Sequence, residues 1–210
     1  MDSDGMAWPE RFFLLYRQAG IRAPQEACAK AFYRSDDALA SRFPLDGLDL
    51  EQTVRLQVGC VIDELAPARP DVAERVLRGF VDDSRRQLGK NKPLLERLRR
   101  RFKLGIVSNF YGNLEGLLAR EGLGALFDVV ADSGRIGAMK PDKRMFLHAL
   151  SALGSEPEEA LMVGDSLARD MRGAEALGMP HAWLSTGRQD PCCARGTFLR
   201  TLEDLEPLLS

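Results

Sequence analysis

The feature that most constrains the fold is a change of pattern near residue 93. Before this point, apolar residues recur at the three- and four-residue spacing of amphipathic helices, and no alternating apolar and polar run interrupts them. After it, short apolar runs alternate with helical segments. Strands that alternate with helices are typical of a parallel sheet covered by helices on both faces. The sequence therefore predicts a helical segment followed by a doubly wound α/β segment.

Four helices are expected in the first segment, and their starts are marked by prolines or by a capping residue. Pro9 suits the first turn of one helix, and Pro24 opens a second. Asp49 is placed to cap a third helix, and Pro70 opens the fourth. Residues 9–92 are therefore predicted to form a helical domain.

In the second segment, four short apolar runs are predicted to be strands that are buried on both faces. These strands cover residues 104–107, 127–130, 160–163 and 181–184. Helices are expected over residues 93–100, 113–120, 142–153 and 167–177, and a loop over 187–196. Ligands of open α/β sheets bind beyond the carboxyl ends of the strands, so functional residues are expected there.

Composition and charge exclude several classes of protein. The chain has 29 Lys and Arg residues against 31 Asp and Glu, a net charge of −2, which argues against a nucleic-acid-binding protein. No apolar run approaches the ~20 residues of a membrane span, and the first residues lack the pattern of a signal peptide. Four cysteines in 210 residues do not make a disulfide scaffold. We therefore expect a cytoplasmic protein that has neither a membrane nor a nucleic acid as partner.

Polar residues follow three of the predicted strands. Ser108 and Asn109 follow the first strand, and Lys140 precedes the helix that comes after the second. Asp165 follows the third strand, and Asp170 comes five residues later. Taken singly, each has a plain structural interpretation: a helix cap, a solvated lysine, a turn with an N-cap. Their order at the strand ends of one sheet favours a functional site.

This order of motifs resembles that of the haloacid dehalogenase-like (HAD) superfamily of hydrolases. The matching residues are Asp2 and Asp4 in the first motif, Ser108 in the second, Lys140 in the third, and Asp165 with Asp170 in the fourth. The resemblance implies a mostly parallel, Rossmann-like α/β core over residues 1–8 and 93–210. Residues 9–92, which lie between the first two motifs, would then form a helical cap domain over the site.

The resemblance also implies a phosphohydrolase that acts on a small phosphorylated metabolite. Asp2 would attack phosphorus to form an aspartyl-phosphate. Asp4 would protonate the leaving oxygen and then activate the water that hydrolyses the intermediate. Lys140 would offset charge on the phosphate, and Ser108 and Asn109 would hold phosphate oxygens.

A magnesium ion is the cofactor that the resemblance implies. Asp2, Asp4 and Asp165 would be its ligands, because Mg²⁺ prefers hard oxygen donors. Asp170 is expected to orient Lys140 or a metal-bound water. The resemblance leaves the oligomeric state open.

The first motif departs from the family pattern. The family places this motif at the end of a central apolar strand, whereas only Met1 precedes Asp2 here. We therefore expect the first central strand to be missing and the chain to be N-terminally truncated.

Three other functions stay open at this point. They are a 2-haloacid dehalogenase, a phosphomutase of the same family, and a catalytically silent HAD-like binding protein. The dehalogenase needs neither a metal nor an acidic residue at position 4, so Asp4 and Asp165 favour the phosphatase.

Overall fold

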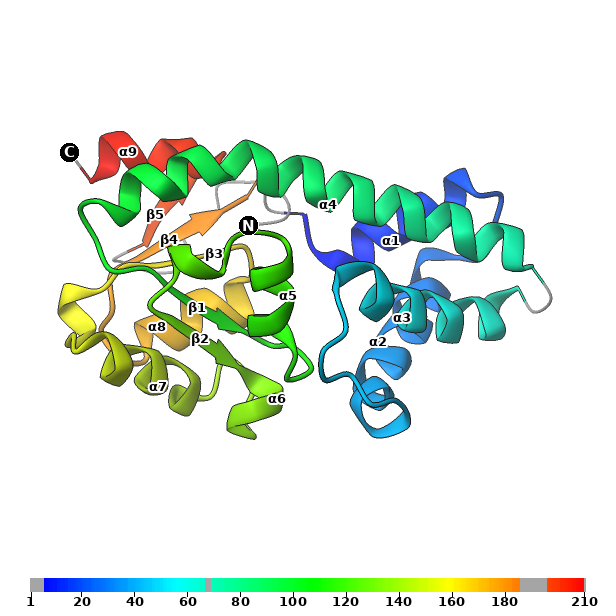
Figure 1. The fold of residues 1–210 in the computed structure, drawn as a ribbon, viewed down its shortest axis with the longest axis horizontal. Helices are drawn as coiled ribbons and strands as arrows, with labels where there is room; N and C mark the ends of the chain where they lie inside the picture. The colour runs from blue at the N-terminus through cyan, green and yellow to red at the C-terminus, as the bar shows by residue number, and fades with distance from the viewer. Residues whose placement is uncertain (1–5, 67–68, 186–195, 210) are drawn as a thin grey trace.

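A computed structural model describes residues 6–66, 69–185 and 196–209. The described chain has two parts, and one long helix runs along both of them (Figure 1). The first part is a group of helices that corresponds to the predicted helical domain. The second part contains all the strands.

The helical part consists of α1 (Trp8–Gln18), α2 (Gln25–Arg42), α3 (Leu50–Leu65) and the first half of α4 (Pro70–Arg99). The predicted helix starts are confirmed. Pro9 lies in the first turn of α1, and Pro24 is the N-cap of α2. Asp49 caps α3 by accepting a hydrogen bond of 2.8 Å from the amide of Gln52, whose side chain accepts one from the Asp49 amide in return. This reciprocal pair satisfies amides that a helix start leaves unbonded.

Aromatic side chains fill the core of the helical part. The rings of Phe12 and Phe80 stack with centroids 4.2 Å apart, and the Tyr16 ring also stacks with Phe12, with centroids 5.9 Å apart. All three side chains are almost completely buried. Burial of an apolar side chain of this size contributes roughly 1.5–3 kcal/mol to the stability of the fold. The helical part therefore has a hydrophobic core.

Helix α4 corrects one prediction, because no separate helix starts at Pro93. The helix runs unbroken through this residue, and the predicted domain boundary between residues 92 and 93 falls inside it. A proline in a helix interior costs about 3 kcal/mol. Leu94 and Leu98 on the far side of Pro93 are buried in the α/β core, and their burial offsets that cost.

In the described residues the α/β part contains five short strands, and each strand pair among them is parallel. The strands are β1 (Gly105–Ser108), β2 (Val129–Asp132), β3 (Met162–Gly164), β4 (His181–Leu184) and β5 (Gly196–Leu199). The first four match the predicted strands, shifted by up to two residues. Strand β5 was not predicted: its first residue, Gly196, was assigned to a loop, and residues 187–195 of that loop lie outside the described residues.

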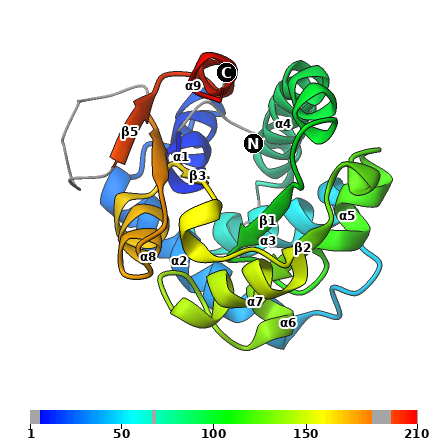
Figure 2. The ribbon, with the colours of Figure 1, turned by 90° about the vertical axis from the view of Figure 1, so that its left-hand side faces the viewer.

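Helices cover both faces of these strands (Figure 2). They are α5 (Leu114–Arg120), α6 (Ser133–Ile136), α7 (Lys143–Leu153), α8 (Arg172–Glu175) and α9 (Leu205–Leu208). On one face, Val107 and Val129 pack in the cluster that contains α7 and α8. On the opposite face, Ile106 and Val130 pack with α5 and α4. This layered arrangement is the predicted doubly wound fold.

The strands form two sheets, with the orders β1-β2 and β3-β4-β5. Strands β1 and β3 are the neighbouring strands of the two sheets in the core (Figures 1 and 2). Among the described residues no strand lies between them. One edge of β1 and one edge of β3 therefore lack a strand partner in the described part of the chain.

In the described residues, no helix combines the length and the apolar character that crossing a membrane would need.

Candidate functional site

The candidate site lies where the strands end. Ser108 is the last residue of β1 and pairs in register with Asp132, the last residue of β2. Asp165 follows Gly164, the last residue of β3. Because the strands within each sheet are parallel, their carboxyl ends meet at one edge, where ligands of such sheets bind.

Lys140 and Asp170 form a buried ion pair at this edge. Nζ of Lys140 lies 2.6 Å from Oδ1 of Asp170, and the two side chains are only 12% and 4% exposed. Oδ2 of Asp170 accepts a hydrogen bond of 3.0 Å from the amide of Ser166. Asp170 therefore contacts Lys140, which is one of the two roles considered for it from the sequence.

Asn109 holds the backbone on both sides of Lys140. The amide of Lys140 donates to Oδ1 of Asn109 at 2.7 Å, and Nδ2 of Asn109 donates to the carbonyl of Lys140 at 3.2 Å. The side chain expected to bind phosphate is thus engaged in positioning the lysine. Ser108 lies next to Asn109 and is half-buried at the end of β1.

Asp165 presents a carboxyl group at the same edge. The residue as a whole is exposed, and its carbonyl accepts a hydrogen bond of 2.9 Å from Nε1 of Trp183. Desolvation by neighbouring atoms raises the pKa of the Asp165 carboxyl, and the Asp170 carboxylate raises it further, while Lys140 lowers it. Asp2 and Asp4 lie outside the described residues, so the structure brings Asp165 together with Lys140 and Asp170 only.

The loop that follows β1 connects Asn109 to the rest of the molecule. We call residues 109–113 the site loop. Asp132, which is fully buried, accepts hydrogen bonds of 2.9–3.0 Å from the amides of Gly112, Leu114 and Gly134. Sequence reasoning missed this residue, although an aspartate directly after an apolar run was the available signal.

Ser133 adds a second anchor for the site loop. Its hydroxyl accepts from the amide of Phe110 and donates to the carbonyl of the same residue, both at 2.8 Å. With Asp132, this contact fixes the backbone of the loop against the end of β2. The position of Asn109, and through it that of Lys140, therefore depends on side chains that follow β2.

The site loop also contacts the helical part. The phenol of Tyr111 donates a short hydrogen bond to Oδ1 of Asp36 in α2. Nδ2 of Asn113 donates to Oγ1 of Thr53 in α3 at 2.9 Å. Nothing in the sequence pattern singled out these pairs, because their members are more than fifty residues apart.

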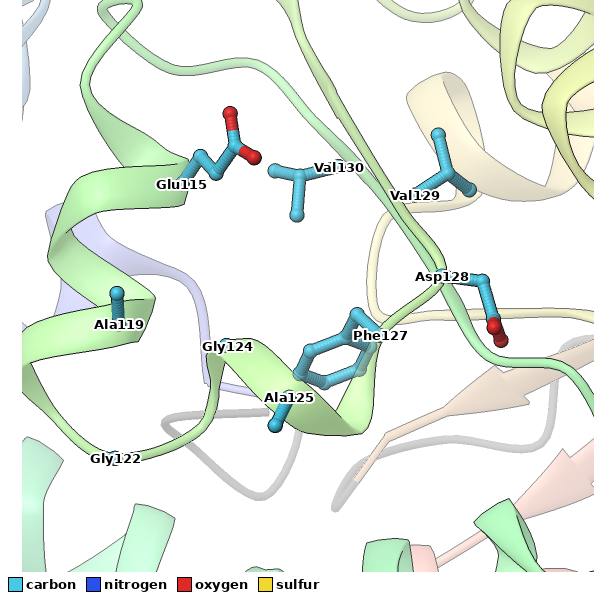
Figure 3. Close-up of a pocket in the computed structure, with 9 residues that line it drawn as sticks. All are labelled: Glu115, Ala119, Gly122, Gly124, Ala125, Phe127, Asp128, Val129 and Val130. Carbon is cyan, nitrogen blue, oxygen red and sulfur yellow. The ribbon is translucent and has the colours of Figure 1, made fainter.

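A hollow of about 450 Å³ lies elsewhere, between β2 and α5. Figure 3 shows its lining, in which Glu115 and Ala119 of α5 face Phe127 and Val130. None of the predicted site residues that the structure describes lines it. It lies at the start of β2, whereas the candidate site lies at the strand's end.

The side chains at the candidate site include oxygen donors that could bind a metal ion. Within residues 6–66, 69–185 and 196–209, no three His, Cys, Asp or Glu side chains lie close enough together to hold a metal ion. The desolvated carboxylate of Asp165 is a hard oxygen donor of the kind that Mg²⁺ prefers. Asp165 is therefore the described residue that fits a Mg²⁺ site at this edge, whereas Asp2 and Asp4, the other expected ligands, lie outside the described residues.

Comparisons with known proteins identify the family. A family model described as haloacid dehalogenase-like hydrolase matches residues 16–178. The bovine (Bos taurus) haloacid dehalogenase-like hydrolase domain-containing protein 3 is 34% identical over 212 residues, which cover 92% of this chain and 83% of that protein.

A bacterial phosphatase and a solved HAD phosphatase structure are also similar to this chain. The phosphoserine phosphatase of Thermus thermophilus is 36% identical over 128 residues, which cover 59% of this chain and 51% of that enzyme. The crystal structure of a HAD phosphatase from Thermococcus onnurineus matches 96% of this chain and 87% of its own, with 29% identity and a TM-score of 0.57. The order of motifs, the fold and these matches agree, and the chain belongs to the haloacid dehalogenase-like hydrolases.

Proposed function

We propose that this protein is a Mg²⁺-dependent phosphohydrolase that cleaves a small phosphorylated metabolite through an aspartyl-phosphate. The observation that carries the proposal is the buried Lys140–Asp170 pair at the strand ends, with Ser108 and Asp165 at the same edge. A phosphoryl group carries dispersed negative charge, so a fixed ammonium group that is poorly exposed to water interacts strongly with it.

The proposed roles follow from this arrangement and from the family motifs. A carboxylate oxygen of Asp2 attacks phosphorus, and the bond from phosphorus to the leaving oxygen breaks. Asp4 gives its proton to that oxygen, then takes a proton from the water that cleaves the aspartyl-phosphate. Lys140 offsets charge on the phosphoryl oxygens, and the hydroxyl of Ser108 donates to one of them.

Asp170 and Asn109 act as positioning residues in this proposal. Asp170 fixes the ammonium group of Lys140, and Asn109 fixes its backbone. A side chain held from both ends loses little freedom when the substrate binds, which is the basis of electrostatic preorganisation.

Mg²⁺ would be held by Asp165 together with Asp2 and Asp4. When bound, it would supply positive charge against the phosphoryl group. Desolvation and the charge of Asp170 raise the pKa of the Asp165 carboxyl, and a bound cation would favour its ionised form.

Relatives support the choice of a phosphate ester over a haloacid. Similar proteins include a phosphoserine phosphatase, a pyrimidine 5′-nucleotidase from Escherichia coli and glyceraldehyde 3-phosphate phosphatases. In this proposal residues 1–8 and 93–210 form the catalytic core, and residues 9–92 form the cap that covers the substrate.

Hydrolysis of p-nitrophenyl phosphate tests the proposal. We expect activity that needs Mg²⁺, is lost with EDTA, and falls at least about 100-fold in Asp2→Asn and in Lys140→Met. Lys143→Met, an exposed lysine on α7, is the matched control and should retain activity.

The same assay separates the other functions. Activity that persists in Asp2→Asn would contradict the assignment of the nucleophile. Release of halide from 2-chloropropionate without metal would instead identify a dehalogenase, and movement of phosphate within a sugar phosphate would identify a mutase. A folded protein that is inactive on all of these substrates would support the silent binding protein.

A further inference from the structure

The site loop is attached to both parts of the molecule. On the core side, the side chain of Asn109 bonds to the backbone amide and carbonyl of Lys140. Asp132 accepts hydrogen bonds from the amides of Gly112 and Leu114. On the cap side, Tyr111 bonds to Asp36. The few residues from 109 to 113 therefore link the position of the cap to the position of Lys140.

Asp36 is the centre of the contact on the cap side. It is half-buried on α2, and Oδ1 accepts both the phenol of Tyr111 and, at 3.4 Å, Nε2 of Gln57 from α3. Ser35 binds the carbonyl of Gln57, which ties α2 to α3 behind this contact. The carboxylate thus joins two cap helices to the site loop, and a hydrogen bond to a charged acceptor is about twice as strong as a neutral one.

The two parts also meet through the buried hydrogen bond from Asn113 to Thr53 and through Leu117 and Phe110, which pack against the core of the helical part. The ion pair between Arg135 and Asp46 is exposed to water, where such pairs contribute little to stability, whereas the Glu121 side chain that pairs with Arg85 is only 13% exposed. The amide oxygens of Gln57 and Asn113 are buried and have no hydrogen-bond partner within the described chain. Opening the junction would hydrate these oxygens, so the closed arrangement depends on the few strong contacts that it does make.

We propose that Asp36 and Tyr111 are positioning residues whose hydrogen bond holds the cap closed against the site loop, so that the cap and Lys140 are fixed together. The consequence for catalysis rests on the proposed function, whereas the effect on cap position does not. In the open arrangement the cap has moved away from the site loop. Loss of this hydrogen bond should shift the equilibrium between the closed and the open arrangement about 10-fold toward the open one.

Hydrogen exchange of the site-loop amides in the full chain is the deciding measurement. We expect the amides of Gly112 and Leu114 to exchange about 10-fold faster in Tyr111→Phe and in Asp36→Ala, while the amides of α7 keep the wild-type rate. Asp36→Asn keeps an oxygen that accepts the phenol but loses the charge, so exchange should be only about 3-fold faster than in wild type.

Two neighbouring side chains on α2 provide matched controls. Tyr33→Phe removes an exposed phenol, and Asp37→Ala removes an exposed carboxylate beside Asp36. Neither should change the exchange of the site loop. Faster exchange throughout the protein in Tyr111→Phe would overturn the proposal, because it would reveal a general loss of stability. Unchanged exchange in Tyr111→Phe and Asp36→Ala would overturn it as well.

Kinetics on p-nitrophenyl phosphate supply the second readout. KM should rise by several-fold to about 10-fold in Tyr111→Phe, and kcat should change by less than about 2-fold, because bound substrate restores the closed arrangement. If no variant hydrolyses the ester but the exchange rates still differ as stated, the positioning pair is supported and the proposed function fails. If the wild type is active and Tyr111→Phe lowers kcat alone, Tyr111 acts in the chemistry and the positioning proposal fails.

Discussion

Gly164 lies against Asp170 so closely that no side chain fits between them. A Cβ at position 164 would lie 2.6 Å from the Cβ of Asp170, well inside van der Waals contact. Gly164 ends β3, and Asp170 is the residue that pairs with Lys140. The glycine of the fourth motif therefore sets how closely Asp170 approaches the sheet and the lysine.

Replacement of Gly164 by alanine should displace Asp170 and weaken the ion pair. We expect a loss of about 1–3 kcal/mol in the free energy of unfolding, because the new methyl group overpacks a filled space. Urea denaturation measures this loss. Gly59→Ala is the control: nothing lies within 4 Å of that helical position in α3, so the change should stabilise the protein by roughly 0.5–1 kcal/mol. Equal effects at both glycines would contradict the proposed crowding.

The Lys140–Asp170 pair should be strongly coupled in stability. Lys140→Met leaves a buried carboxylate without its cation, which costs about 3–5 kcal/mol. The double variant Lys140→Met, Asp170→Leu removes both charges and should be more stable than Lys140→Met alone. A double-mutant cycle in urea checks this coupling. If the losses in unfolding free energy of the two single variants add up to that of the double variant, the interaction between the two charges contributes nothing to stability.

Asp132 should be more important for stability than any exposed aspartate. Asp132→Ala leaves the buried amides of Gly112 and Leu114 without their acceptor, and each unmet amide costs about 1–3 kcal/mol. We expect a clearly lower thermal midpoint, with the fastest hydrogen exchange in the site loop. Asp46→Ala, at an exposed ion pair, should shift stability by less than about 0.5 kcal/mol. Similar effects of the two variants would argue against the anchoring role of Asp132.

The pH dependence of stability should reveal Asp36. Desolvation raises the pKa of its carboxyl and Asp37 adds to this, whereas the hydrogen bond from Tyr111 and the charge of Arg169 lower it; the net direction is upward. The folded protein therefore binds this proton more tightly than the unfolded chain does. Ionising Asp36 thus costs folding stability as the pH rises above about 4.

Asp36→Asn removes that cost. The stability of the variant relative to wild type should therefore increase as the pH rises from about 4, and then level off once Asp36 is ionised in the folded protein. Unfolding free energies measured across this range give the difference directly. A difference that falls with rising pH would mean that the pKa of Asp36 is lowered and would falsify this prediction.

The sequence predicted local features well because they depend on neighbouring residues. Asp49 caps α3 through Gln52, three residues away, and Gly154 ends α7 in the left-handed conformation that glycine adopts freely. The motif order likewise placed Lys140 and Asp170 at one edge, where they meet. Each of these features can be read within a few residues or within one motif.

Contacts between distant segments could not be predicted in this way. The bond between Asp36 and Tyr111 joins a cap helix to the site loop, and no local pattern marks either residue. Asn109 was expected to bind phosphate because of its position, but the structure engages it with the backbone of Lys140. Such pairings depend on how the cap packs on the core, which propensity and periodicity do not encode.

Pro93 provides a test of how tertiary packing overrides local preference. It lies inside α4, where a proline lacks the amide that would bond to the carbonyl four residues earlier and its ring crowds that carbonyl. Pro93→Ala should therefore stabilise the protein by up to about 3 kcal/mol. The gain is reduced because the unfolded chain of the variant has more conformational entropy than that of the wild type. Pro9→Ala is the matched control, because Pro9 lies in the first turn of α1, where a proline costs nothing, and its effect should stay within about 0.5 kcal/mol. Thermal and urea unfolding compare the two variants. If Pro93→Ala is neutral or destabilising, then α4 is shaped around the proline, and the burial of Leu94 and Leu98 depends on the local geometry that Pro93 imposes.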